Sequence, residues 1–223
     1  MTWAKRVFDL AGAGVGVVLL APLFALLAIL VKAEDGGPVF FRQERVGYRG
    51  RPFRMWKFRT MVPDAEAIGL PLTVGRDPRV TRIGAWLRRW KLDELPQLFN
   101  VLVGDMTLVG PRPEVPRYVA LYDAAEQRVL ELVPGITDEA SLRYADESTM
   151  LAAAADPEQV YIDEIVKEKI RLNLAYAARA TLWTDLRVIL ATLRWLLRWS
   201  DGIPPVASRR LTRLFTAPKS PTR

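Results

Sequence analysis

The sequence predicts an α+β fold that is mostly helical, with an N-terminal helix that enters a membrane, a small β-hairpin and amphipathic helices at the membrane interface. Three observations lead to this prediction. An uncharged run of 22 residues, Leu10–Val31, carries a proline near its middle. Two short β-like segments flank a glycine-containing turn at residues 47–50. Much of the remaining chain has the apolar spacing of amphipathic helices, most plainly at residues 182–199.

The run Leu10–Val31 is long enough to cross a hydrocarbon core of about 30 Å, and it exceeds the apolar region of a signal peptide. Basic residues lie on both sides of it, Lys5 and Arg6 before it and Lys32 after it, and basic flanks favour the cytoplasmic side. Pro22 lacks a backbone donor and breaks the helix. We therefore predict a re-entrant helix that enters and leaves the same leaflet. The alternative is a helix buried in a soluble core.

Pro38–Val46 and Pro52–Met61 are predicted to be the two strands of the hairpin. Residues 42–59 carry seven basic side chains and one acid, interleaved with aromatic residues. This composition suits a surface at the lipid headgroups or a solvated basic hairpin. Residues 62–80 contain three prolines and predict a loop, with one helical turn near 64–68. A short amphipathic helix is predicted at Thr81–Trp90.

Helices are also predicted along the second half of the chain, at Glu114–Leu132, Thr149–Ala155 and Asp156–Ala180. The last predicted helix, Leu182–Trp199, combines tryptophan and leucine residues with three arginines. A helix of this kind either lies in the membrane interface or packs its apolar face on the core.

The domain organisation that follows is simple. Residues 1–35 form the membrane anchor, and residues 36–199 form one domain that acts as a unit with it. Residues 200–223 are rich in Pro, Ser and Arg and predict a basic tail that is disordered or loosely bound to the membrane.

The composition restricts the chemistry. The chain has no cysteine and no histidine, which excludes thiolate catalysis, a Ser-His-Asp triad, an imidazole base and the common zinc sites. Catalysis would use carboxylates, hydroxyls, arginine or lysine, and a metal would be a hard, oxygen-bound ion. The net charge of +7 indicates an anionic partner. Because residues 123–168 hold twelve acids and three bases, the basic regions form no continuous track, and no nucleic-acid partner is expected.

Two adjacent acids, Asp93 and Glu94, open an apolar helical segment. Asp93 is predicted to be the N-cap, with Pro96 in the first turn, and the helix dipole favours the ionised form of both acids. Such a pair can supply a nucleophile and a metal ligand, although acids at helix starts are also ordinary caps. Six basic residues and one acid lie between positions 76 and 91, a field suited to a nucleoside diphosphate.

Three segments together resemble a known family: KFRTM at 57–61, LDELPQLFNVL at 92–102 and GPRP at 110–113. In this order they are similar to the bacterial sugar transferases called small monotopic phosphoglycosyl transferases, or polyprenyl-phosphate sugar-1-phosphate transferases. The resemblance runs from residue 4 to about 197. The chain departs from the family pattern at Ala21, where relatives often have Ser, and at Asp138–Arg143, where many have Gly-x-x-Gln-Val. Sugar specificity is therefore not carried over.

The resemblance implies an enzyme on the cytoplasmic face of the inner membrane. It would move a sugar-1-phosphate from a UDP-sugar to a polyprenyl phosphate, releasing UMP, at the start of polysaccharide or glycoconjugate assembly. The family match assigns the nucleophile to Asp93, assisted by Glu94, with Mg²⁺ or Mn²⁺ held by the two acids. The substrate phosphates are expected to be bound by four basic residues: Lys57, Arg59, Arg88 and Arg112.

The competing hypothesis is a non-catalytic membrane-surface protein that binds anionic lipid, for which the basic hairpin and the Trp-rich helix suffice. Replacement of Asp93 by Asn distinguishes the two hypotheses, because a lipid-binding protein should tolerate the change and the enzyme should not. The sequence leaves open the sugar, the glycan pathway and the oligomeric state.

Overall fold

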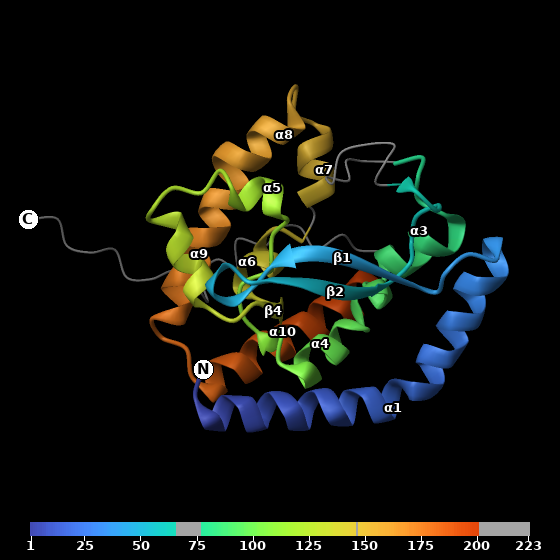
Figure 1. Ribbon diagram of the computed structural model, residues 1–223, viewed down its shortest axis with the longest axis horizontal. Helices are drawn as coiled ribbons and strands as arrows, with labels where there is room; N and C mark the ends of the chain where they lie inside the picture. Colours follow the sequence, from blue (N-terminus) through green and yellow to red (C-terminus); the bar gives the residue numbers. More distant parts are fainter. Residues whose placement is uncertain (66–76, 146, 201–223) are drawn as a thin grey trace, which may run out of the picture.

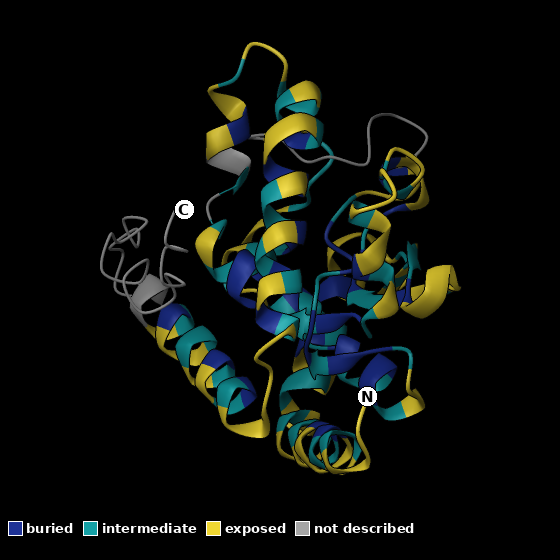
Figure 2. Cartoon of the chain, turned by 90° about the vertical axis from the view of Figure 1, so that its left-hand side faces the viewer, coloured by how far each residue is buried: buried dark blue, intermediate teal, exposed yellow. Residues whose placement is uncertain are grey.

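The computed structural model describes residues 1–65, 77–145 and 147–200. The predicted tail beyond Ser200 and most of the predicted turn at 64–68 lie outside the described residues. Figure 1 shows the helix α1 along one edge of the molecule, with the other elements on one side of it. Buried residues gather where these elements meet, and exposed residues cover the outer faces (Figure 2).

The apolar run forms one long helix, α1 (Trp3–Asp35), which begins at the N-cap Thr2 and ends at Gly36, where φ is +72°. The helix changes direction part-way along its length (Figure 1), and it contains Pro22, which cannot donate the backbone hydrogen bond of a regular helix. The structure therefore has one continuous but bent helix where the sequence predicted a helix broken at Pro22 (Figure 1). By length and composition α1 could cross a membrane; its re-entrant path stays a prediction.

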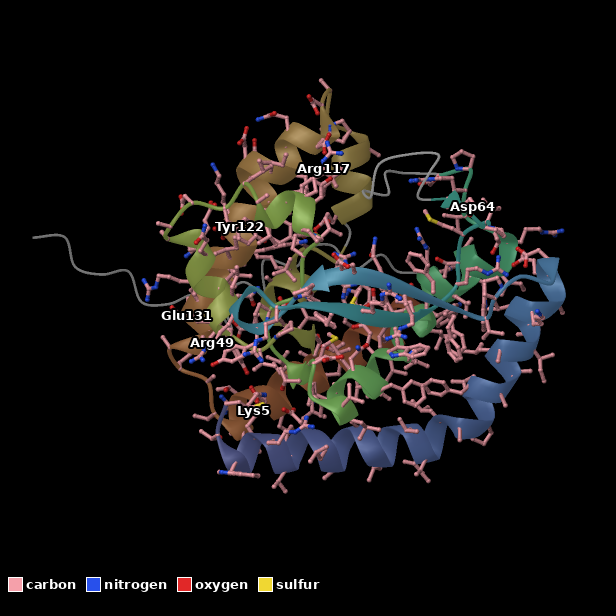
Figure 3. The ribbon with its side chains drawn as sticks, viewed as in Figure 1. Lys5, Arg49, Asp64, Arg117, Tyr122 and Glu131 are labelled. Carbon is pink, nitrogen blue, oxygen red and sulfur yellow. The ribbon has the colours of Figure 1, made fainter. Side chains whose placement is uncertain are left out.

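Polar contacts hold the first turns of α1 on the rest of the chain. Asp9 is fully buried in the helix and accepts hydrogen bonds from the Thr107 hydroxyl at 2.6 Å and from the Leu108 N–H at 3.1 Å. Lys5, labelled in Figure 3, pairs with Asp185 of the last helix at 2.6 Å. These bonds place the start of the anchor against segments about 100 and 180 residues later in the chain.

The predicted hairpin is confirmed, with shorter strands. β1 (Phe40–Val46) and β2 (Pro52–Phe58) pair antiparallel, and Phe40 lies opposite Phe58. The turn between them places Arg49, labelled in Figure 3, at φ +56°. Asn100, on a later helix, accepts a hydrogen bond from the N–H of Trp56 at 2.9 Å and donates one to the Arg54 carbonyl at 3.0 Å, so its side chain satisfies the free edge of β2.

A second, parallel pair of strands is absent from the sequence-based prediction. β3 (Thr107–Val109) pairs with β4 (Gly135–Thr137). A Cβ atom at Gly135 would lie 2.1 Å from the Gly110 nitrogen, so the two backbones approach closely enough to require glycine. A strand of three residues is too short to show an alternation of apolar and polar side chains, so the sequence did not indicate these strands.

The middle of the chain contains short helices. α3 (Arg82–Arg89) confirms the predicted helix, with Thr81 as its N-cap, and α4 (Gln97–Val103) follows it. The long helix predicted at 114–132 is wrong: the structure has α5 (Pro116–Val119) and a 3₁₀ helix at Glu126–Glu131. The Asp123 carboxylate accepts from the N–H groups of Ala125 and Glu126, a local turn that competes with a continuous helix.

The C-terminal third is helical, as predicted from residue 149 onward. It contains α6 (Glu139–Arg143), α7 (Glu147–Ala152), α8 (Pro157–Val160), a π-helical turn (Tyr161–Val166), α9 (Lys167–Ala177) and α10 (Leu182–Ser200). The short helix α6, which lies before residue 149, was not predicted. α10 buries Val188 and Trp195 but exposes Trp183 and Leu193. One side of this helix therefore packs on the core, and the contact of the other side with lipid stays a prediction.

Candidate active site

The predicted acid pair lies at a corner between α3 and α4. Lys91 takes a left-handed conformation with φ +54°, and a 3₁₀ turn at Leu92–Glu94 follows it. The N-cap position of α4 is occupied by Pro96, which offers no side-chain acceptor. The prediction that Asp93 caps the helix is therefore wrong, because the 3₁₀ turn separates it from the start of α4.

Asp93 is 6% exposed, and its Oδ1 atom has no hydrogen-bond partner among the described residues. Burial raises the pKa of Asp93, and the neighbouring charge of Glu94 raises it further; Lys57, Lys91 and Arg88 oppose the shift. The helix dipole was expected to favour the ionised form of this acid, but the pKa shift of Asp93 has the opposite direction because burial disfavours the charged form. Asp93 thus has a destabilised carboxylate at the wall of the cavity, which suits a nucleophile.

Glu94 has the opposite environment. Arg112 donates hydrogen bonds to both carboxylate oxygens of Glu94, from Nη1 to Oε2 at 3.0 Å and from Nη2 to Oε1. The Lys57 amine lies 3.5 Å from Oε1. Burial alone would raise the pKa of Glu94, but Arg112 and Lys57 hold it well below its usual range. Glu94 is therefore a stable anion that positions two cations beside Asp93.

The two cations come from distant parts of the chain. Lys57 lies near the end of β2, and burial lowers its pKa to about 8 despite the attraction of Glu94. Arg112 follows β3, and its backbone N–H donates to the buried Asp138 carboxylate at 3.1 Å. Asp138 also caps α6 by accepting from the Ser141 N–H at 2.7 Å. The sequence pattern Asp-x-x-Ser could have indicated this cap, but it gave no sign of the contact with Arg112.

The other two predicted phosphate ligands differ from each other. Arg88 lies at the same cavity as Asp93, with its Nε 2.8 Å from the Thr60 hydroxyl. Arg59 instead binds Asp35 with both terminal nitrogens and the Pro38 carbonyl with Nε at 2.6 Å. All four predicted phosphate ligands therefore line the cavity, where Lys57 and Arg112 contact Glu94 and Arg59 is bound to the end of α1.

A cavity of about 1870 Å³ opens over these groups. Among the described residues there is no cluster of three acids that could hold a metal alone. Asp93 fits a ligand role because it lines the cavity, whereas Glu94 could join a metal only by loosening its bond to Arg112. A divalent ion would therefore need oxygen atoms from the substrate as well as from the protein.

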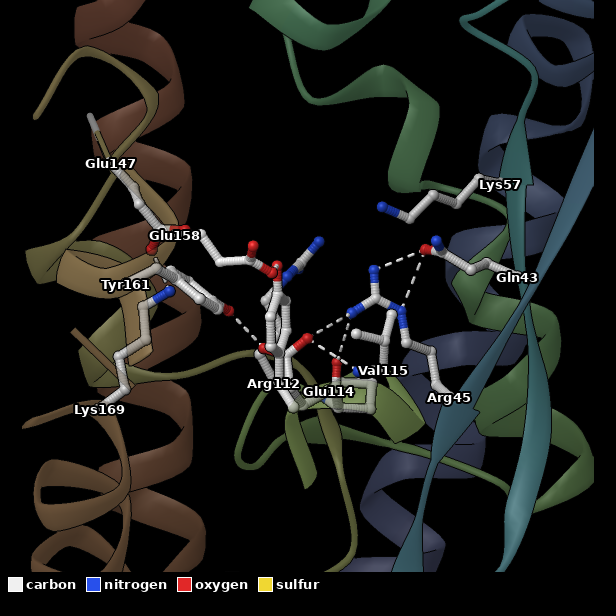
Figure 4. Close-up of polar contacts among 12 residues, drawn as sticks. Gln43, Arg45, Lys57, Arg112, Glu114, Val115, Glu147, Glu158, Tyr161 and Lys169 are labelled. Atoms are coloured by element: carbon white, nitrogen blue, oxygen red, sulfur yellow. Dashed lines mark hydrogen bonds and ion pairs between the residues drawn. The ribbon is translucent and has the colours of Figure 1, made fainter. Parts of the chain in front are cut away.

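A second polar network beside the cavity did not emerge from the sequence. Glu114 accepts hydrogen bonds from Arg45 at 3.2 Å and from the Tyr161 hydroxyl. Arg45 also donates to Gln43 at 2.6 Å. Figure 4 shows Arg45 extending from β1 toward Glu114, with Tyr161 and Lys169 approaching from the opposite side. The network fixes the segment directly after Arg112, and only its position next to GPRP could have indicated it.

The arrangement combines one unpartnered carboxylate with cations that can neutralise phosphate oxygens. Such a site can attack a phosphorus atom and stabilise the charge of the leaving phosphate. The sequence matches the profile of the bacterial sugar transferases over residues 1–199.

Three relatives illustrate the match. An undecaprenyl-phosphate glucose phosphotransferase of Komagataeibacter xylinus is 39% identical over 197 residues, which cover 85% of this chain and 35% of the relative. A UDP-glucose:undecaprenyl-phosphate glucose-1-phosphate transferase of Caulobacter vibrioides is 38% identical over 204 residues, 86% of this chain and 69% of the relative. The exopolysaccharide production protein ExoY of Rhizobium meliloti is 44% identical over 149 residues, 60% of this chain and 66% of the relative. The chain thus spans between about a third and two thirds of these proteins.

Proposed function

The chain belongs to the bacterial sugar transferase family, and on that premise we propose that it transfers a sugar-1-phosphate from a UDP-sugar to a polyprenyl phosphate at a membrane. Relatives named for undecaprenyl phosphate support the acceptor class. The observation that carries the proposal is the contrast between the two acids: Asp93 lines the cavity and forms no ion pair among the described residues, whereas Glu94 is bound by Arg112 and Lys57. One acid is available for attack, and the other organises the cations.

In the first half-reaction a carboxylate oxygen of Asp93 forms a bond to the β-phosphorus of the UDP-sugar. The bond from that phosphorus to the bridging oxygen breaks, and UMP leaves with the bridging oxygen and its electron pair. The raised pKa of Asp93 reports a carboxylate that burial destabilises, so its negative charge is transferred readily to the leaving group. Lys57, Arg88 and Arg112 neutralise the phosphate oxygens as charge moves.

In the second half-reaction a phosphate oxygen of the lipid attacks the same phosphorus. The bond to Asp93 breaks, the carboxylate is restored, and a polyprenyl diphospho-sugar is formed. The step needs no net proton transfer and therefore no imidazole base, which agrees with a chain that has no histidine. Two displacements at one phosphorus predict ping-pong kinetics.

A divalent ion, Mg²⁺ or Mn²⁺, would be held by Asp93 and by oxygen atoms of the diphosphate, with Glu94 as a second protein ligand. When bound, it would offset negative charge on the phosphoryl group and the leaving UMP. The oxygen-rich character of the site supports this assignment, since the chain has no histidine or cysteine ligands.

The membrane arrangement belongs to the same proposal. We infer that α1 lies re-entrant in the cytoplasmic leaflet of the inner membrane and that the protein is monotopic. The bend of α1 (Figure 1) and its basic flanks support this topology. Exposed apolar side chains along α1 give it a lipid-facing surface, since Val18 and Leu19 are each 73% exposed.

The proposal is tested by incubating the purified protein with a panel of UDP-sugars and undecaprenyl phosphate while UMP is measured. We expect one or a few UDP-sugars to release UMP and to yield a lipid-linked diphospho-sugar. A non-catalytic lipid-binding protein would release none. Retained binding to anionic vesicles without UMP release from any sugar in the panel would favour that alternative.

A further inference from the structure

Gln97 lies one turn after Asp93 and has an unusual environment. Among the described residues, three buried side-chain atoms lack a hydrogen-bond partner: Oδ1 of Asp93 and both Nε2 and Oε1 of Gln97. The Gln97 side chain is 0% exposed, so solvent does not satisfy it. Buried amides are nearly always hydrogen-bonded, and an exception calls for an explanation.

The two residues are both buried near the corner between α3 and α4. The buried positions along this segment are Asp93, Pro96, Gln97, Asn100 and Val101, so the 3₁₀ turn that holds Asp93 and the helix α4 that holds Gln97 both turn these side chains towards the interior. Asp93 contributes to the wall of the cavity, but Gln97 does not. Gln97 is therefore fully buried behind the lining of the cavity and does not contact a substrate there.

Asn100, another buried residue of this segment, is an amide with a structural role, because its side chain is hydrogen-bonded to the rest of the fold. Its side chain accepts from the N–H of Trp56 and donates to the Arg54 carbonyl and to Asp105. Every polar atom of Asn100 thus supports the hairpin or the end of α4. Gln97 makes no such bond in the described structure, so packing or folding does not account for an amide at this position.

We propose that Gln97 is a positioning residue for the nucleophile: its Nε2–H group donates to the inner oxygen, Oδ1, of Asp93 during the reaction. The inference rests on the function proposed above. With Oδ1 held on the inner side, the outer oxygen of the carboxylate is directed at the cavity and at the phosphorus. The bond holds the same oxygen as the carbonyl of the aspartyl intermediate, so Gln97 serves both half-reactions.

The test replaces Gln97 by Met, which has a similar length and no strong donor, and compares kcat, KM and thermal stability with the natural protein. Because the amide has no partner in the resting fold, Gln97→Met should leave Tm unchanged or raise it. kcat for UMP release should fall about tenfold or more, the loss expected for a hydrogen bond to a charged group. KM for the UDP-sugar should stay within about twofold, since Gln97 does not line the cavity.

Asn100→Leu is the matched control, because it removes a satisfied amide from the same segment and should lower Tm. An unchanged kcat in Gln97→Met would overturn the inference, as would a fall in Tm comparable to that of Asn100→Leu. If Gln97→Met and Gln97→Leu both fail to fold, the amide is structural and the inference is also wrong. Absence of UMP release from the natural protein would instead refute the proposed function, so the two failures are distinguishable.

Discussion

The bond between Arg112 and Glu94 lets us predict how much stability the protein loses when Arg112 is replaced. Replacing Arg112 by Met leaves the buried Glu94 carboxylate with Lys57, at 3.5 Å, as the remaining cation that pairs with it among the described residues. Breaking a buried ion pair by removing one partner costs about 3–5 kcal/mol. We expect about 3 kcal/mol, the lower end, because the Arg112 side chain is 30% exposed and Lys57 remains. For a domain of this size that free energy lowers Tm by about 6–12 °C.

The assay is thermal unfolding of the purified protein in one detergent, with Arg117→Met as the control. Arg117 also pairs with a glutamate, Glu158 at 2.8 Å, but its side chain is 54% exposed. An exposed pair contributes about 0–1 kcal/mol, so this variant should lose at most about 4 °C. The double variant Arg112→Met with Glu94→Gln should recover part of the lost Tm, because no unpaired charge is left, and should stay inactive. Equal Tm values for Arg112→Met and Arg117→Met would refute the view that Glu94 depends on Arg112.

Three further predictions concern the metal, the topology and Arg59. UMP release should disappear in excess chelator and return with Mg²⁺ or Mn²⁺; full turnover in chelator would exclude the ion. Since the chain has no natural cysteine, Trp3→Cys and Ala33→Cys should both react with a membrane-impermeant thiol reagent from the cytoplasmic side; labelling of either from the periplasm would contradict a re-entrant α1. Arg59→Met and Asp35→Asn should lower Tm by similar amounts that do not add in the double variant. A large rise in KM at unchanged Tm for Arg59→Met would instead support phosphate binding by Arg59.

The sequence predicted the long elements well because their signals are local. The apolar run with Pro22 and the turn around Arg49 were recognisable from composition and spacing alone. The helix predicted at 114–132 was wrong because apolar periodicity continued across a turn that Asp123 stabilises. The parallel strands β3 and β4 are too short to show a period.

The sequence indicated which residues form the candidate site, but not that Asp93 and Glu94 have different environments. Asp93 and Glu94 are neighbours, and helix-start chemistry predicted the same ionised state for both. Their environments differ because Lys57 and Arg112, 37 and 18 residues away along the chain, both reach Glu94. Tertiary packing also brings Arg59 into contact with Asp35. No local sequence pattern indicates this contact. The isolation of Gln97 is likewise visible only in three dimensions.

The central claim is that Asp93 carries the sugar phosphate, and one measurement tests it most directly. The protein is incubated with its UDP-sugar in the absence of lipid, and the quenched protein is analysed by peptide mass spectrometry while released UMP is counted. We predict an added sugar phosphate on Asp93, no more than one UMP per protein, and no adduct in Asp93→Asn, which should fold normally. An adduct on another residue, or normal turnover by Asp93→Asn, would contradict the account.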